Sequence, residues 1–302
     1  MASLQIVRIF STFSCFLEIM NVIWHYWQRK NFYPTTAAAT FFWLCVIKFN
    51  ISTKETISIR ESGINCIGKV IILVTSNAPN QALRQAHRQA YSQEFLLDHF
   101  QAQRVFLLAQ DHSLPLATLS EETDTLLGSF EESYRHLSLK HLMGLSWAAA
   151  HCHPDSVIIK MDDDIAVDLP RLIAKATALK PSSIGGWVHS GMKVRRGSST
   201  SKWSVTASEF PNSTYPDFVS GWVYAVTQPT VQEIVAQASI QSGDPFWIDD
   251  VWLTGLVRQQ LEHLRLDPWN DQYTPYHEHL QCCLKEPYHF CDFIAGPTEG
   301  KR

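Results

Sequence analysis

Three adjacent aspartates, Asp162, Asp163 and Asp164, follow the apolar run 157–159. An apolar run of this kind predicts a buried strand, and open α/β folds bind their ligands at the carboxyl ends of such strands. Three like charges repel one another there unless a cation lies among them. Carboxylates suit a hard divalent ion that keeps part of its water shell and also binds phosphates. The triplet therefore predicts a metal and diphosphate site, and a solvated acidic turn is the alternative.

The elements that must position this triplet alternate between strands and helices. Three apolar runs predict buried strands, namely 69–75, 104–109 and 157–159. Two stretches between them predict helices, namely 81–97 and 120–152. This alternation is typical of a parallel sheet with crossover helices. After Pro181, glycines and prolines interrupt the chain, so we expect antiparallel hairpins and loops, with helices again at about 230–238 and 250–260.

The composition excludes some classes of protein. The chain has 302 residues, of which 45% are hydrophobic and 18% charged, and its net charge is −4. These values are not those of a disordered chain, and the charge is not basic enough to indicate binding to nucleic acid. The length allows one large domain or two small ones.

The first fifty residues differ from the rest because they include an uncharged segment, 31–47. Its apolar part is short for a membrane span, which needs ~20 residues, although a thin early-secretory bilayer accepts a shorter span. Arg29 and Lys30 precede it, so the positive-inside rule keeps the N-terminus in the cytosol. An earlier apolar stretch, 9–27, carries Glu18 and is the second choice. The expected segments are a cytosolic part at 1–30, a transmembrane signal anchor at 31–49, a stem at 50–66 and a lumenal domain at 67–302.

The sequons and cysteines are compatible with a lumenal domain. Glycosylation sequons begin at Asn50 and Asn212. The cysteines outside the anchor region have no zinc-binding spacing, so disulfides in an oxidising compartment are the better interpretation. These cysteines are Cys66, Cys152, Cys282, Cys283 and Cys291.

Five segments, taken in order, resemble motifs of the β-1,3-galactosyltransferase family, glycosyltransferase family 31. Residues 84–91 resemble the first-helix motif Arg-x-Ala-Ile-Arg-x-Thr-Trp, and residues 130–140 are similar to Phe-x-Asp-Ser-Tyr-x-Asn-Leu-Thr-Leu-Lys. Residues 202–205 and 215–224 match the Lys-Trp and Tyr-Pro-x-Tyr-x-Ser-Gly-x-x-Tyr blocks. Residues 248–255 resemble Glu-Asp-Val-x-x-Gly. The resemblance rests on this ordered succession rather than on any single motif.

The resemblance implies a GT-A type α/β nucleotide-sugar transferase domain, with a mostly parallel central sheet, flanking helices and an antiparallel acceptor side. It also implies transfer of a hexose from a UDP-sugar with inversion at the anomeric carbon. A divalent ion, Mn²⁺ first and Mg²⁺ second, would neutralise the diphosphate that leaves. Asp164 is the first choice as direct metal ligand, and Asp162 would contact the nucleotide, the ribose or the metal. Asp163 stays open between binding and a structural role.

Inversion needs a base that takes the acceptor hydroxyl proton as the oxygen attacks. Asp250 matches the family's base and begins an expected helix, where a carboxylate is favoured by the helix dipole. The simpler interpretation of an aspartate in this position is a helix cap. Asp249 stands where the family has Glu, and its side chain is one methylene shorter, which puts its reach in doubt.

Other motif residues are candidates for the donor site. Arg84 and Arg88 are four residues apart and share a helix face, so they could meet the nucleotide, or form a solvated face or an internal salt bridge. Lys140 could approach the nucleotide, although a surface lysine is the default interpretation. Gly221, next to Ser220, suggests a close approach of the backbone to the donor sugar, and a plain turn would look the same.

The end of the chain departs from the family pattern. A late histidine usually completes the metal shell in this fold, and His279 and His289 are the candidates here. Cys283 and Cys291 are a plausible disulfide, although connectivity cannot be derived from sequence.

Together these inferences predict a single-pass type II enzyme of the Golgi membrane with a lumenal catalytic domain. The expected donor is UDP-galactose, with UDP-N-acetylglucosamine second, and the acceptor is a glycan on a glycoprotein or glycolipid. A catalytically inactive, lectin-like or partner-stabilising subunit is the alternative from another class. A metal-dependent phosphohydrolase fits poorly, because no second His/Asp metal cluster is found in the sequence.

Overall fold

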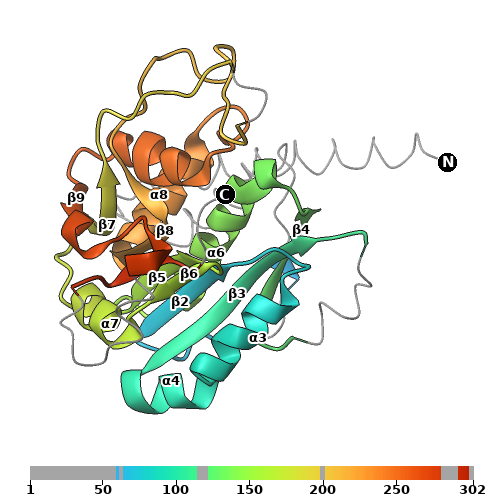
Figure 1. Ribbon diagram of the computed structural model, residues 1–302, viewed down its shortest axis with the longest axis vertical. Helices are drawn as coiled ribbons and strands as arrows, with labels where there is room; N and C mark the ends of the chain where they lie inside the picture. The colour runs from blue at the N-terminus through green and yellow to red at the C-terminus, as the bar shows by residue number, and fades with distance from the viewer. Residues whose placement is uncertain (1–58, 61–63, 114–121, 198–200, 280–291, 299–302) are drawn as a thin grey trace, which may run out of the picture. The chain divides into compact units, whose positions relative to one another are not determined.

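A mixed sheet of eight strands, in the order β1-β4-β3-β2-β5-β8-β7-β9, forms the centre of the described part of the chain. The computed structural model describes residues 59–60, 64–113, 122–197, 201–279 and 292–298 (Figure 1). The strands are β1 (Ile59–Arg60), β2 (Val70–Thr75), β3 (Ala102–Gln110), β4 (Thr125–Glu131), β5 (Val157–Asp162), β7 (Ser183–His189), β8 (Phe218–Thr227) and β9 (Arg265–Pro268).

The pairing divides this sheet into a parallel and a largely antiparallel part. β4, β3, β2 and β5 are parallel neighbours. β8 runs antiparallel to both β5 and β7, while β1 is antiparallel to β4 and β9 is parallel to β7. This confirms the predicted α/β architecture with a mostly parallel centre and an antiparallel part beyond it. A separate two-stranded sheet joins β6 (Ile165–Val167) to β10 (Ala295–Pro297).

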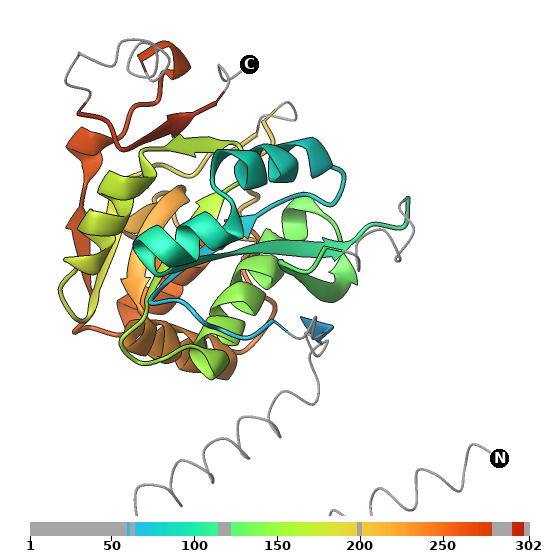
Figure 2. The same ribbon diagram turned by 90° about the horizontal axis from the view of Figure 1, so that it is seen from below.

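Helices cover both faces of the sheet because its central strands are apolar on both sides. On one face, Ile71 and Leu73 of β2 pack with residues of α6 (Leu137–His151) and α8 (Gln228–Ile240). On the other, Ile72 and Val74 pack with α4 (Gln93–Phe100), α7 (Leu169–Thr177) and the β10 segment. Figure 2 shows α6 and α8 on the side of the sheet opposite to α3 (Gln81–Ala90) and α4.

Two predicted helices are wrong in their extent. The stretch 81–97 is divided into α3 and α4, because Tyr91 is extended and Ser92 caps a new helix by accepting a hydrogen bond from the backbone N–H of Phe95. The stretch 120–152 begins with a strand, β4, which pairs with β3, and only its later part is helical. Phe130, whose spacing had indicated a helix, therefore lies in the sheet.

The region after Pro181 follows the expectation in part. β7 and β8 form the predicted antiparallel pair, although the run 203–206 belongs to turns rather than to a strand. The helix expected at 230–238 is α8. The one expected at 250–260 is a π-helix, η2 (Val251–Val257), followed by a 3₁₀ turn, η3 (Arg258–Gln260). Two further 3₁₀ turns are η1 (Tyr134–His136) and η4 (Asn270–Gln272).

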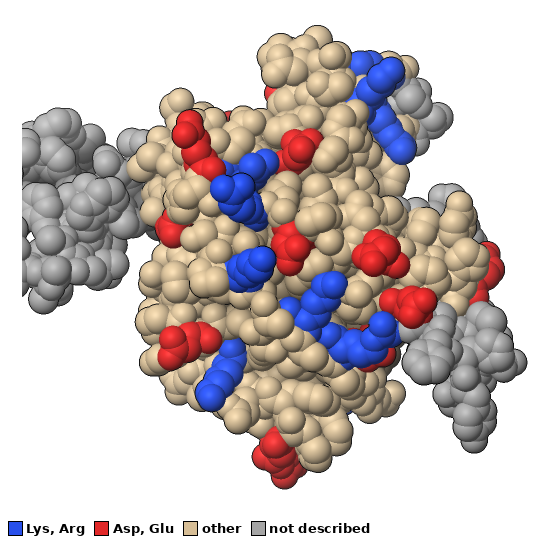
Figure 3. Space-filling view, turned by 90° about the vertical axis from the view of Figure 1, so that its left-hand side faces the viewer, with Lys and Arg blue, Asp and Glu red and all other residues tan. Residues whose placement is uncertain are grey.

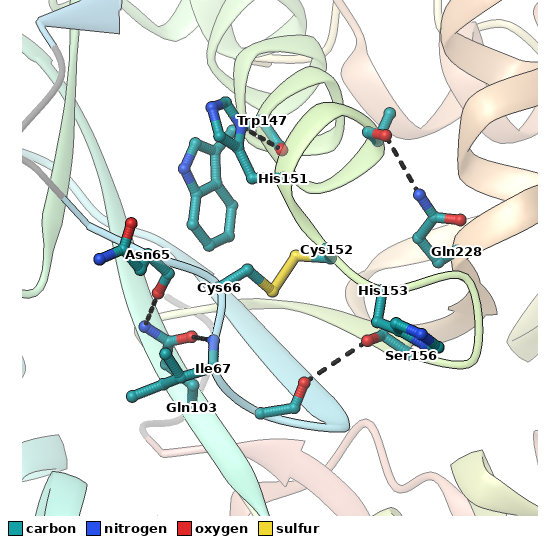
Figure 4. Close-up of a disulfide and its surroundings, with 12 residues drawn as sticks. Asn65, Cys66, Ile67, Gln103, Trp147, His151, Cys152, His153, Ser156 and Gln228 are labelled. Atoms are coloured by element: carbon teal, nitrogen blue, oxygen red, sulfur yellow. Dashed lines mark hydrogen bonds between the residues drawn. A yellow bond between two sulfur atoms is a disulfide. The ribbon is translucent and has the colours of Figure 1, made fainter. Parts of the chain in front are cut away.

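A disulfide joins Cys66, which precedes β2, to Cys152 at the end of α6 (Figure 4). The segment that leads into β2 is also held by Gln103 of β3. The side chain of Gln103 donates to the backbone oxygen of Asn65 and accepts from the N–H of Ile67. The disulfide agrees with the interpretation of the cysteines as disulfide-forming. The proposed partners Cys283 and Cys291 lie outside the described residues.

The predicted signal anchor at 31–49 also lies outside the described residues, as do the segment 1–30 and most of the stem. Within the described ranges, every helix is too short or too polar to cross a bilayer.

The face drawn in Figure 3 mixes acidic and basic side chains, and its basic residues do not form a continuous surface.

Candidate active site

The carboxyl ends of β2 and β5 bring the aspartate triplet beside the turn 76–80. Thr75 is paired with Asp162 in the parallel register, and the N–H of Asp163 donates to the oxygen of Thr75 at 3.0 Å. Because parallel neighbours end at the same edge of a sheet, two segments 87 residues apart in sequence form one surface. The edge predicted from the apolar runs is therefore where the triplet lies.

Asp163 ties these two segments together. Its Oδ2 accepts hydrogen bonds from Ser76 Oγ at 2.7 Å and Asn80 Nδ2 at 3.1 Å, and the residue is 8% exposed. Its backbone oxygen accepts from His87 Nε2 at 2.9 Å. These contacts occupy the side chain with the turn, so they favour the structural role that the sequence left open.

Arg84 and Lys140 lie beneath the same turn rather than on its surface. Each is 1% exposed. Arg84 donates to Ser76 Oγ, to the oxygens of Asn77 and Ala78, and to Glu122. Lys140 Nζ donates to the oxygen of Ser76 at 2.8 Å and to Glu132 Oε1 at 2.5 Å. Side chains so completely enclosed support the turn from below. These contacts favour a supporting role for both residues, and the prediction that they contact the nucleotide stays a prediction.

Arg88 is also placed away from the triplet. It forms ion pairs with Glu122 and Asp124 at 2.7 Å and lies over the ring of Phe106. With Arg104 and other residues it lines a separate open pocket of about 510 Å³ that includes none of the triplet and neither Asp249 nor Asp250. The structure therefore brings Arg84, but not Arg88, to the predicted donor edge.

A buried lysine connects the triplet to the second pair of acids. Lys160 of β5 is 1% exposed, and its Nζ donates to Asp162 Oδ1 at 2.6 Å and to the oxygen of Gly221 at 2.7 Å. The same Nζ is 3.7 Å from Asp249 Oδ2. The N–H of Gly221 in turn donates to Asp250 Oδ2 at 3.0 Å. The two acidic groups, which are 88 positions apart when Asp162 is compared with Asp250, thus belong to one site.

At Gly221 the side chains of Lys160 and Asp250 come close to the backbone of β8. A Cβ atom there would lie 3.2 Å from Lys160 Nζ and 3.4 Å from the Cβ of Asp250. A side chain would push the lysine and the base candidate apart. Gly221 therefore shapes the junction between the two acidic groups, and no contact with a sugar is needed to explain its residue type.

The neighbouring acids Asp249 and Asp250 differ in their electrostatics. Burial and the adjacent Asp249 raise the pKa of Asp250 to about 6, against the hydrogen bonds from Gly221 and Val251. Burial also opposes ionisation of Asp249, but Lys160 and the hydrogen bond from His141 outweigh it and hold the pKa of Asp249 below its usual value. Asp249 is therefore a fixed anion, while Asp250 is a carboxylate that can accept a proton near neutral pH.

Asp162 and Asp164 are the acids of the triplet that remain open to a ligand. Burial raises the pKa of Asp162 to about 7, with Lys160 opposing the shift and Asp249 adding to it. Partial loss of water contact, and after it the adjacent Asp163, raise the pKa of Asp164 as well. Thr298, just beyond β10, donates twice to the backbone oxygen of Asp164. The carboxylate of Asp164 itself is exposed.

Of the two histidine candidates, only His279 lies in the part of the chain that the structure describes. His279 is exposed, and its ring lies 3.3 Å from the hydroxyl of Thr274 and stacks on Phe293. His289 lies outside the described residues. Among the residues that the structure describes, no three His, Cys, Asp or Glu side chains are grouped to hold a metal ion. Asp162 and Asp164 are the two acids of the triplet whose carboxylates could face such an ion.

Comparison with known sequences decides the family. The sequence model of the Galactosyltransferase family matches residues 81–267, which is more than half of the chain. The chain belongs to the galactosyltransferase family. This range includes the triplet, Gly221 and Asp250, whereas Cys66, His279, His289 and β10 lie outside it.

Relatives with curated names agree with this family. The chain is 30% identical over 184 residues to Beta-1,3-galactosyltransferase 1 of Mus musculus, with 57% of this chain and 55% of that protein covered. It is 27% identical over 249 residues to Lactosylceramide 1,3-N-acetyl-beta-D-glucosaminyltransferase B of Danio rerio, with 76% and 61% covered. The chain thus spans little more than half the length of these relatives. A glycosyltransferase involved in glycosylation of the major capsid of PBCV-1 is 13% identical, covers 77% of this chain and 94% of its own, and has a TM-score of 0.38, which is too low to support an argument.

The site of this galactosyltransferase-family chain contains residues that the sequence analysis did not single out. Lys160 is one, and a lysine inside an apolar strand was a signal that could have found it, because an unpaired buried charge is costly. His141 is another, and it meets Tyr224, which the sequence suggested only as a sugar-stacking or core residue, in the folded chain. Tyr134 is a third: partial burial and the charges of Asp249 and Asp250 raise its pKa.

Proposed function

We propose that the chain transfers a hexose from a UDP-sugar to the 3-hydroxyl of an acceptor glycan, with inversion, and so forms a β-1,3 linkage. UDP-galactose is the first donor, because the family and the mouse relative are named for galactosyl transfer. UDP-N-acetylglucosamine is the second, because the zebrafish relative named for that sugar matches a larger share of this chain. Both relatives carry a 1,3 linkage in their names.

The observation that carries the proposal is the contact of both acidic groups with Lys160 and Gly221. Lys160 binds Asp162 and the oxygen of Gly221, and the N–H of Gly221 binds Asp250. Inverting transfer requires a donor diphosphate on one side of the anomeric carbon and a base on the other side, beside the acceptor hydroxyl. The two groups of acids are close enough to act on one substrate pair.

Each acid then has one task. Asp250 accepts the proton of the acceptor hydroxyl as the oxygen attacks the anomeric carbon, since its pKa of about 6 leaves it ionised at neutral pH. The backbone N–H groups of Gly221 and Val251 hold its two oxygens at 3.0 and 2.8 Å, so the carboxylate keeps a fixed orientation. Asp162, held by Lys160 and 33% exposed in its side chain, binds the donor side.

The triplet also fits a divalent ion. Its three acids have Lys160 as their one ion-pair partner among the described residues. Burial first, and neighbouring carboxylates second, raise the pKa of Asp162 and of Asp164, and a bound cation would offset both effects. We propose that Asp164, with Asp162, holds Mn²⁺ or Mg²⁺, whose chemistry when bound is to neutralise the diphosphate that leaves. Diphosphate, water and a late histidine, for which His279 and His289 are the candidates, would supply the remaining coordination.

Replacing Asp164 with Ala is expected to weaken binding of UDP in the presence of Mn²⁺ by more than about 100-fold, since loss even of an outer partner of a bound metal costs 10–100-fold. Calorimetry of UDP binding with and without Mn²⁺ measures this. Asp155→Ala is the matched control, because Asp155 precedes the same strand and its side chain is 86% exposed. Equal UDP affinity of Asp164→Ala and the wild type would contradict the metal proposal.

We also propose a single-pass type II location in the Golgi membrane with this domain in the lumen. The disulfide between Cys66 and Cys152 supports an oxidising compartment. Asn212 of the second sequon is exposed, as a glycosylated residue must be.

Lumenal placement predicts that Asn212 carries an N-linked glycan when the chain is made in animal cells. Asn212→Gln and Thr214→Ala are each expected to remove one glycan, seen as a faster-migrating band whose mobility changes less after peptide-N-glycosidase treatment. Ser213→Ala keeps the sequon and is the matched control. A wild-type chain whose Asn212 is wholly unmodified in peptide mass spectra would argue against lumenal exposure.

The proposed reaction is tested by incubating the full chain with Mn²⁺, a panel of UDP-sugars, and acceptors that end in galactose or N-acetylglucosamine. UDP release that depends on the acceptor, and a product whose new linkage is β-1,3 by NMR, are the expected results. Glycan binding without UDP-sugar binding would favour the lectin-like alternative. Acceptor-independent release of phosphate would favour the phosphohydrolase.

A further inference from the structure

The interior behind Asp249 contains a polar cluster in which two members, His141 and Tyr224, have no role in the reaction as described so far. Lys160, His141 and Tyr224 are 1%, 0% and 1% exposed, and they come from β5, α6 and β8. Buried polar groups of this kind are costly unless each has a partner. In this cluster every polar side-chain atom has a hydrogen-bond partner, and Tyr224 is connected through His141 to Asp249.

The hydrogen bonds determine the tautomer of His141. Its Nδ1 lies 2.9 Å from Asp249 Oδ2 and its Nε2 lies 2.5 Å from the hydroxyl of Tyr224. An ionised carboxylate only accepts, so Nδ1 carries the proton and donates it to Asp249. Burial lowers the pKa of His141, so the ring is neutral and Nε2 is an acceptor. Burial raises the pKa of Tyr224, which therefore remains a phenol and donates to Nε2.

Asp249 is thus held from two sides at the same oxygen. His141 Nδ1 and Lys160 Nζ both approach its Oδ2, at 2.9 and 3.7 Å. Lys160 is at the same time bonded to Asp162 and to the oxygen of Gly221. An anion fixed in this way cannot rotate to take a proton from an acceptor, and it keeps its negative charge beside Asp250.

The arrangement also explains how Asp249 works where the family has a longer Glu. The shorter side chain of Asp249 does not have to reach into the interior, because the imidazole of His141 reaches out from α6 to meet it. The contact spans 108 positions in sequence, so neither residue indicates the other before folding.

We infer that His141 is a positioning residue for the reaction. It donates its Nδ1 proton to Asp249 and is itself oriented by Tyr224, so that Asp249 stays a fixed anion and Asp250 alone serves as proton acceptor. The inference rests on the transfer reaction proposed above. It assigns a role within that reaction to His141, Tyr224 and Asp249, which act through Asp250 and not on the substrate.

Two substitutions separate positioning from packing. The amide nitrogen of Asn can occupy the place of Nδ1, so His141→Asn keeps the donor to Asp249 and loses the contact with Tyr224. Gln extends further along the side chain, so His141→Gln can keep a contact with Tyr224 but lacks a donor at the Nδ1 position. Each variant loses one buried hydrogen bond, so a purely structural role would affect both alike. His151→Gln is the matched control, since His151 lies on the same helix and is exposed.

In the full chain, His141→Gln is expected to lower kcat about 10–100-fold, the cost usual for a supporting hydrogen-bond partner, with the KM for UDP-sugar unchanged. His141→Asn is expected to retain most of kcat, and His151→Gln to match the wild type. The inference is overturned if His141→Gln has the kcat of the wild type, or if His141→Asn loses as much as His141→Gln.

A second measurement does not depend on transfer. In ¹⁵N-edited NMR spectra of the wild-type chain, the resonances that vanish in His141→Asn should be those of a neutral ring protonated at Nδ1. A ring protonated at Nε2, or a charged ring at neutral pH, would overturn the inference whatever the activity. Absence of sugar transfer by the wild type would instead refute the proposed function, and the NMR result would still decide whether the arrangement exists.

Discussion

Asp250→Asn is expected to abolish sugar transfer while UDP-sugar still binds. The amide keeps the size of the carboxylate but cannot accept a proton, and loss of a positioned general base costs about 10²–10⁴-fold in rate. Asp162 and Asp164, on the donor side, are not touched by the change. We therefore expect kcat to fall by that factor and UDP affinity to remain, as measured by UDP release and by calorimetry.

Asp250→Asn also has a structural cost that must be separated from the catalytic one. Both oxygens of Asp250 accept backbone N–H groups, from Gly221 and from Val251. An amide presents an NH₂ to one of these donors, and an unmet buried hydrogen bond costs about 1–3 kcal/mol. Thermal unfolding of the variant shows whether it remains folded at the assay temperature. Asp244→Asn, at an exposed position in the loop before the site, is the control. Full transfer by a folded Asp250→Asn variant would exclude the proposed mechanism.

The carboxyl of Asp250 is also expected to make kcat fall at acidic pH, which gives the pH profile of kcat an acid limb. Burial and the adjacent Asp249 raise the pKa of Asp250 to about 6. Below that pH the base is protonated and cannot accept the hydroxyl proton, so kcat at saturating donor and metal should fall about tenfold per pH unit below about 6 and level off above it. Residual activity of Asp250→Asn should lack this limb. Lys160 and Asp249 face the same carboxyl, but the lysine is held as a cation and Asp249 as an anion across this range.

The core strands and the acidic groups could be predicted from the sequence because each has a local signal. Residues 70–74, 105–109 and 157–159 are apolar without interruption, which is what burial on both faces of a parallel sheet requires. Asp162 and its neighbours follow such a run directly. Family resemblance then singled out Asp250, whose position at the start of η2 is confirmed.

The errors in the predicted fold come from contacts between distant segments. The spacing of Phe130 and Tyr134 is compatible with a helix, yet Phe130 lies in β4 because Thr125 to Leu127 pair with β3. Helix spacing over a few residues is weaker than the burial of a whole strand beside an apolar neighbour. The helix 81–97 was divided for a local reason that the sequence did contain, since Ser92 is a favoured cap residue.

The side-chain roles were harder to predict than the elements. Arg84 and Arg88 share a helix face, but one is 1% exposed beneath the turn and the other lies in a separate pocket with Glu122 and Asp124. How deeply a charged side chain is buried depends on the ion-pair and hydrogen-bond partners that distant segments of the chain supply. For the same reason, His141 could not be connected with Asp249 from sequence.

Removing the disulfide between Cys66 and Cys152 is expected to lower the free energy of unfolding by about 4–5 kcal/mol. The bond closes a loop with a sequence separation of 86 residues, and the loss of freedom in the unfolded chain grows with loop length, reaching about this value. The loop contains β2, β3 and β4, so three of the four parallel strands at the centre of the sheet lie between the two cysteines. Such a loss is a large share of the ~5–15 kcal/mol that stabilises most domains.

The double variant Cys66→Ser with Cys152→Ser tests this in urea unfolding of the full chain. Dithiothreitol should destabilise the wild type to the level of the variant and should not change the variant further, which separates this bond from effects of the other cysteines. An unfolding midpoint equal to that of the oxidised wild type would show that the bond does not constrain the unfolded chain. The active-site acids lie at the carboxyl end of β5 and just before η2, whereas the bond is attached before the start of β2. A variant that remains folded should therefore keep the dependence of kcat on the pKa of Asp250. A shifted limb would mean that the bond supports the site itself and not only the stability of the sheet.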